Sequence, residues 1–83
     1  MGEKQIEEII ENLEELQKDI TVPKNVKIKI QGIIDVLKGK AELSMRINRA
    51  LNDLDEMADD ANMQSYTRTQ IWNVVSLLEK ISS

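Results

Sequence analysis

The sequence predicts an all-α protein, a four-helix bundle made of two tandem helical hairpins related by an internal repeat. Apolar residues recur at three- and four-residue steps along most of the 83 residues, which is the pattern of amphipathic helices. Residues 13–38 also match residues 54–79 without a gap, at an offset of 41 positions. Self-similarity at this period is typical of a repeated unit of two helices and a turn.

The repeat divides a single domain, residues 1–83, into halves of about 1–40 and 41–83. Matching positions carry similar side chains in both halves: Ile6/Ile47, Leu13/Leu54, Leu16/Met57, Lys27/Arg68, Ile30/Ile71 and Val36/Leu77. Two-helix solenoid repeats have a similar length, but a solenoid also needs capping repeats at its ends. Two units therefore favour a closed bundle.

The first half predicts helices over residues 3–19 and from Pro23 to about residue 38. Thr21 is expected to cap the second helix, because its hydroxyl can accept a hydrogen bond from a free backbone N–H. Proline lacks an N–H but fits the first turn of a helix. Gly39 is expected to end this helix in the left-handed conformation.

The second half predicts helices over residues 41–59 and 64–81, separated by a break at 60–63. Asn62 is the expected cap of the last helix. Apolar residues cover much of that helix's circumference, which is typical of a central helix. Trp72 is accordingly expected in the core or at an interface.

Composition narrows the possible classes of protein. The chain contains no cysteine, histidine or phenylalanine, so its core must be aliphatic and it forms no disulfide. No apolar run approaches the ~18 residues of a membrane span, and the N-terminus lacks the features of a signal peptide. These observations favour a cytoplasmic protein that does not enter the membrane.

No catalytic, cofactor-binding or metal-binding residue is predicted, and the chain is not expected to be an enzyme. Without His or Cys, the common catalytic triads and thiolate or imidazole zinc sites are impossible. Acidic clusters occur at Glu8, Glu11 and Glu15 and at 55–60, but neither has the spacing of a calcium loop. An enzyme using carboxylates and a divalent metal is the weakest alternative.

Charge alternates along the chain despite a formal net charge of −4. Residues 1–22 are acidic, whereas residues 23–40 carry five lysines and one acid. Lys24, Lys27, Lys29 and Arg68 are candidate anion contacts, which would suit an auxiliary component of a nucleoprotein assembly. The acidic total argues against nucleic acid, so the preferred interpretation is a solvated face beside acidic neighbours.

Two motifs resemble a known family. They are Thr21-Val22-Pro23-Lys24-Asn25 and Asn62-Met63 followed by Thr67-Arg68-Thr69-Gln70-Ile71-Trp72. In this order they resemble a family of small archaeal proteins, the uncharacterised protein family UPF0147. This chain has Gln64 where that family is expected to have proline. The resemblance implies a compact helical protein and brings no activity, cofactor or catalytic residue.

The preferred functional hypothesis is a protein-interaction or structural module with an unknown protein partner. Ile28, Val36 and Leu77 are apolar but lie away from the apolar stripes of their helices. Val36 and Leu77 occupy matching positions, and the internal symmetry suggests that they are neighbours in one patch. Such a patch would suit a homodimer. The alternative is that the second and fourth helices each contact three neighbours within the monomer.

Overall fold

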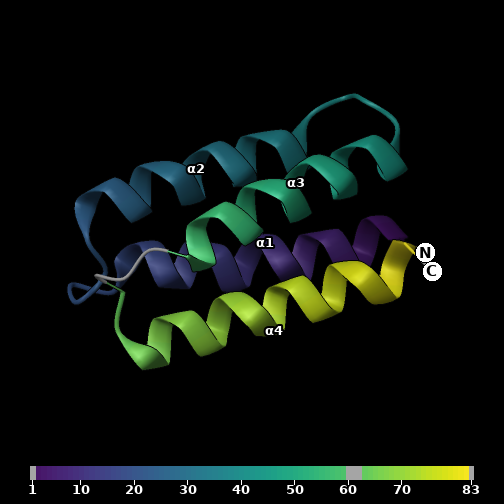
Figure 1. Cartoon of the computed structure of the whole chain (residues 1–83). Coiled ribbons are helices and arrows are strands. Elements are labelled where there is room, and N and C mark those ends of the chain that lie inside the picture. Colours follow the sequence, from purple (N-terminus) through teal and green to yellow (C-terminus); the bar gives the residue numbers. More distant parts are fainter. Residues whose placement is uncertain (1, 60–62, 83) are drawn as a thin grey trace.

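The computed structural model describes residues 2–59 and 63–82, and these residues contain four helices (Figure 1). They are α1 (Gly2–Lys18), α2 (Lys24–Lys38), α3 (Leu43–Ala58) and α4 (Ser65–Ser82). Each bound lies within two residues of the sequence-based expectation, and the all-α class is confirmed. The starts of α1 and α3, and those of α2 and α4, differ by the same 41 positions that relate the sequence segments.

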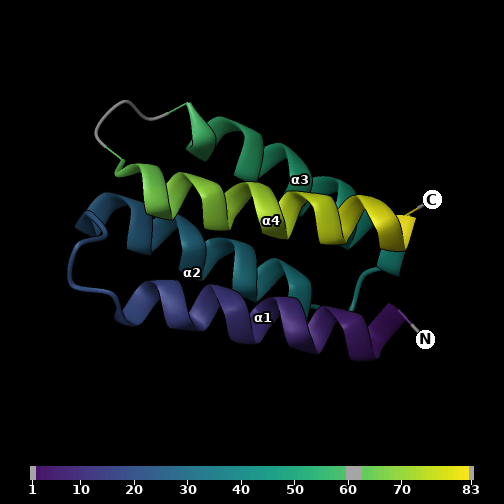
Figure 2. The same ribbon diagram turned by 90° about the horizontal axis from the view of Figure 1, so that it is seen from below.

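The helices form a closed ring in which each packs against two neighbours. Contacts join α1 to α2, α2 to α3, α3 to α4 and α4 back to α1. The two views agree that α2 and α4 lie diagonally opposite each other, as do α1 and α3 (Figures 1 and 2). The α2–α3 connection lies at the same end as both chain termini, and the α1–α2 turn lies at the other end. α4 is therefore no more central than the other helices.

The core is aliphatic, as expected, and takes buried side chains from all four helices. Leu13 of α1 and Leu54 of α3 are both fully buried, as are Ile30 of α2 and Ile71 of α4. Trp72 does not belong to this core, because 47% of its surface is exposed. Of the two expected places for Trp72, the core is therefore excluded, since the aliphatic side chains close the ring without it. A place at an interface stays a prediction.

The turn before α2 does not use Thr21 as a helix cap. The Thr21 backbone N–H and hydroxyl both donate hydrogen bonds to Oδ1 of Asp19, at 2.9 and 2.7 Å. Pro23 occupies the cap position and makes no side-chain cap bond, but its carbonyl accepts the Lys27 N–H at 3.0 Å. The expected Thr21 cap is therefore wrong, because the nearer carboxylate takes the hydroxyl.

Gly39 ends α2, but not in the conformation that was expected. Gly39 has φ −67° and ψ 178°, which is extended backbone and not the left-handed conformation expected there. Its N–H still donates to the Val36 carbonyl at 3.1 Å and so closes α2.

At the start of α4, the Gln64 carbonyl accepts the Arg68 N–H at 3.0 Å, which is the role of the Pro23 carbonyl in the first half. Asn62, the expected cap of α4, lies outside the described residues.

We expect Thr21→Ala to raise the pKa of Asp19 toward its ordinary value. The Thr21 hydroxyl, followed by the Thr21 amide and the charge of Lys27, holds the pKa of Asp19 below that value. A depressed pKa contributes stability that is present above the unfolded-state pKa and is lost as pH falls through the folded-state pKa. NMR titration of the Asp19 carboxyl carbon measures the change. Thr21→Ser keeps both donors and should leave the pKa low, and an unchanged pKa in Thr21→Ala would contradict this role.

We expect Thr67→Val to raise the free energy of unfolding by about 1 kcal/mol, because a buried hydroxyl without a partner costs stability. Thr67 is fully buried, and its Oγ1 has no hydrogen-bond partner among the residues that the structure describes. The matching position in the first half is Val26, which is also fully buried. Urea unfolding measures the change. Thr67→Ser is the control and should destabilise, since it keeps the hydroxyl and removes a methyl group.

Candidate functional site

The four cations suggested as anion contacts do not converge on one surface. Lys24, Lys27 and Lys29 lie in the first turns of α2, and Lys27 is close enough to Asp19 to lower its pKa. Arg68 lies on α4, diagonally opposite α2 in the ring. These side chains therefore do not form a continuous strip for a phosphate backbone.

The structure also separates the three candidate interface residues. Ile28 is 64% exposed on the outer side of α2. Val36 lines a groove between α2 and α3, whereas Leu77 lines a groove between α1 and α4. The expectation that Val36 and Leu77 share one patch is wrong, because α2 and α4 lie diagonally opposite each other. A groove between α2 and α3 and a groove between α1 and α4 are therefore on different sides of the ring.

The groove that holds Val36, here called the α2–α3 groove, lies where the α2–α3 connection crosses the end of the bundle. It has a volume of about 240 Å³. Apolar and cationic residues line it: Val36, Gly39, Lys40, Ala41, Met45, Arg46 and Arg49. Met45 is 63% exposed, so the groove presents both an apolar edge and positive charge to solvent.

Arg46 fixes the shape of this groove. Its side chain is only 11% exposed. Nε donates to the Ala41 carbonyl at 2.9 Å, and Nη1 donates to the Leu37 carbonyl at 2.8 Å. Nη2 donates to Oε1 of Glu3 at 2.6 Å. One guanidinium therefore holds the end of α2, the following connection and the start of α1 on α3.

Sequence reasoning counted Lys40 among the lysines that make the second helix basic, but it did not single out Arg46 or Arg49. One available signal was an arginine near the start of the next helix, because a cation that reaches the end of the preceding helix can bond its last free carbonyls. The position that matches Arg46 in the other half is Gln5. The contact with Glu3 lies 43 positions away in sequence and has no local signature.

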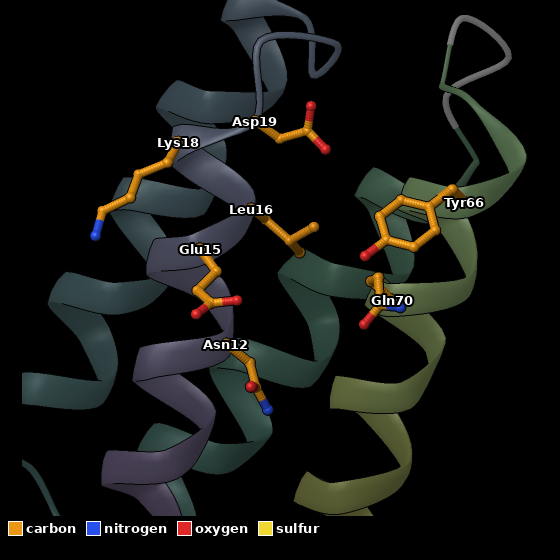
Figure 3. A pocket seen from close by; sticks show the side chains of 7 residues that line it. All are labelled: Asn12, Glu15, Leu16, Lys18, Asp19, Tyr66 and Gln70. Carbon is orange, nitrogen blue, oxygen red and sulfur yellow. The ribbon is translucent and has the colours of Figure 1, made fainter.

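A second candidate site is a polar cleft between the end of α1 and the start of α4 (Figure 3). It has a volume of about 440 Å³ and is lined by Asn12, Glu15, Leu16, Lys18, Asp19, Tyr66 and Gln70. Tyr66 and Gln70 face α1 across the cleft, whereas Lys18 extends away from α4.

The chemistry of this polar cleft is limited to hydrogen bonding and charge. Glu15 and Asp19 contribute carboxylates, and Oδ1 of Asp19 already accepts two hydrogen bonds from Thr21. Small-molecule sites are usually lined by apolar side chains, but here Leu16 and the ring of Tyr66 are the main apolar surfaces. Among the described residues, His, Cys, Asp and Glu form no group of three that could hold a metal ion.

Comparisons with known proteins show the family of this chain. A family model described as "Uncharacterised protein family (UPF0147)" matches residues 1–81. The chain belongs to this family. It is 37% identical over 82 residues to a UPF0147 protein of Archaeoglobus fulgidus, covering 99% of this chain and 94% of the relative. It is 40% identical over 85 residues to a UPF0147 protein of Methanocaldococcus jannaschii, with 96% and 91% covered.

A solved structure extends the similarity to the fold of this UPF0147 chain. The crystal structure of MMP1188, a protein of unknown function, superposes with a TM-score of 0.87 at 38% sequence identity. The match covers 90% of this chain and 86% of that one. The family and the helical fold that the two sequence motifs suggested are therefore confirmed. No described helix is long and apolar enough to cross a membrane.

Proposed function

We propose that this UPF0147 protein is a non-enzymatic interaction module that binds a partner protein in the cytoplasm. The observation that carries the proposal is the α2–α3 groove, where the exposed thioether of Met45 adjoins cationic side chains. Exposed apolar residues scattered singly are ordinary, but methionine at the edge of a groove suits a binding surface.

The core does not need the groove residues, which supports a role in binding. The aliphatic side chains of the four helices close the ring, and Met45 lies outside that cluster. Ile28 is likewise exposed on α2, the helix that contributes Val36 to the groove. Surface apolar side chains that add nothing to the core are available to a partner.

Affinity capture from the native archaeal cell, followed by quantitative mass spectrometry, tests this function. The baits are the wild type, Met45→Glu in the groove, and Ile20→Glu as a matched control. Ile20 is 93% exposed in the turn at the opposite end of the bundle. We expect at least one protein to be enriched by the wild type and by Ile20→Glu but not by Met45→Glu. Nuclease treatment should not change this enrichment.

Two outcomes would contradict the interaction module. In the first, no protein is enriched over an unrelated bait of similar size and charge. In the second, enrichment depends on nucleic acid, and a gel shift persists at physiological salt of about 0.15 M. The second outcome would favour the auxiliary component of a nucleoprotein assembly instead.

A further inference from the structure

The α2–α3 groove is cationic in a protein whose net charge is −4. Its lining includes Lys40, Arg46 and Arg49 and no acidic residue. Arg46 is paired with Glu3, but Lys40 and Arg49 form no ion pair within the part of the chain that the structure describes. Two cations at this groove are therefore free to pair with a ligand.

A row of apolar and small residues continues from Val36 along the exposed side of α2, beyond the residues that line the groove. Ile28, Gly32 and Val36 are spaced at four-residue steps, so successive members are neighbours on the helix surface, and the row turns by about 80° from Val36 to Ile28. A Cβ placed on Gly32 would meet nothing within 4 Å, so the middle of this row is open. The row is about 12 Å long at 1.5 Å per residue, which is roughly two turns of a partner helix.

The groove that holds Leu77, here called the α1–α4 groove, is the natural comparison. Its lining includes Gln5, Glu8, Leu77, Lys80 and Ile81. These positions match Arg46, Arg49, Val36, Gly39 and Lys40 at the 41-residue offset. Matching positions therefore line both grooves, but Glu8 replaces Arg49 and Ile81 replaces Lys40. Of these two grooves, the α2–α3 groove is the one that combines apolar side chains with charged residues that are all cationic.

We propose that the α2–α3 groove binds an acidic amphipathic helix of a partner protein. The apolar face of that helix packs on Ile28, Val36 and Met45, and its flanking carboxylates pair with Lys40 and Arg49. Helices that dock in grooves use anchors at three- and four-residue steps, which fits the spacing of the α2 row. This proposal rests on the proposed interaction function and specifies the chemistry of the partner.

A second copy of this chain fits the groove less well. α1 is the most acidic helix, but its apolar residues, such as Ile9 and Leu13, are buried in its own core. The exposed surface of α1 offers carboxylates such as Glu7 and Glu11 without an apolar face. A partner helix that supplies both charge and apolar side chains is therefore the better complement.

Fluorescence anisotropy with designed peptides tests the proposal. One labelled helix carries leucine on one face and glutamate on its flanks. A second has glutamine in place of every glutamate, and a third has lysine. We expect saturable binding of the glutamate helix to the wild type at about 0.15 M salt, with affinity at least about ten-fold weaker for the glutamine helix.

Variants of the protein locate the contact. Lys40→Glu combined with Arg49→Glu should weaken binding of the glutamate helix by at least about ten-fold and create binding of the lysine helix. Met45→Glu should also weaken it. Leu77→Glu in the α1–α4 groove is the matched control and should bind like the wild type. Circular dichroism confirms that each variant is folded, and amide chemical shifts in wild type should change at residues 28–49.

Several outcomes would overturn the acidic-helix proposal. The proposal fails if the glutamate helix does not bind at about 1 mM, or if the glutamate and glutamine helices bind equally well. It also fails if the changes in amide chemical shift are confined to the α1–α4 groove. Concentration-dependent shifts at residues 28–49 without peptide would assign the groove to a second copy. If Met45→Glu loses a captured protein but the glutamate helix does not bind, the acidic-helix proposal is rejected. The proposed function as an interaction module then still stands.

Discussion

Leu54→Ala is expected to lower the free energy of unfolding by about 3 kcal/mol, because it leaves a cavity among buried side chains. Leu54 is fully buried on α3 and belongs to the aliphatic cluster. A small domain has little stability to spare, so the variant is expected to be partly unfolded at elevated temperature. Urea unfolding followed by circular dichroism measures the change.

Two controls make the Leu54 result specific. Leu13→Ala removes the same side chain from the matching position of the first half, which is also fully buried. If the two halves pack alike, the two losses should agree within about 1 kcal/mol. Met45→Ala truncates an exposed residue of α3 and should cost less than about 0.5 kcal/mol. A loss below about 1 kcal/mol for Leu54→Ala would show that this part of the core is not tightly packed.

Arg46→Met is expected to lower the free energy of unfolding by about 2 kcal/mol. The substitution keeps an apolar stem but removes the donors to the Leu37 and Ala41 carbonyls and to Glu3. The bond to the Leu37 carbonyl is partly buried, so water does not fully replace the lost donor. Urea unfolding again measures the loss.

Neighbouring variants separate the causes of the Arg46 effect. Glu3→Gln removes only the ion pair with an exposed carboxylate and should cost about 0.5 kcal/mol. Arg49→Met replaces an exposed arginine one turn further along α3 and should be nearly neutral. Equal losses for Arg46→Met and Arg49→Met would mean that the carbonyl bonds do not stabilise the α2–α3 connection.

The candidate site was much harder to predict than the fold. Helical period alone places Ile28 and Val36 away from the core, and Ile28 is indeed exposed. Their role at an interface stays a prediction. The period does not say which neighbouring helix a flank faces, so Val36 and Leu77 were wrongly joined in one patch. Lys40 and Arg49 line the same groove because the α2–α3 connection brings the end of α2 beside α3. No local sequence pattern predicts the path of that connection.

The sequence by itself determined the four helices, their approximate bounds, the aliphatic core and the family. Each of these depends on short-range periodicity or on matched motifs, which are written in consecutive residues. Only the tertiary structure decided the ring order of the helices, the hydrogen bonds of Arg46 and the separation of the two grooves. These features depend on contacts between residues far apart in the chain, such as Glu3 and Arg46, and so they exist only when the ring has closed.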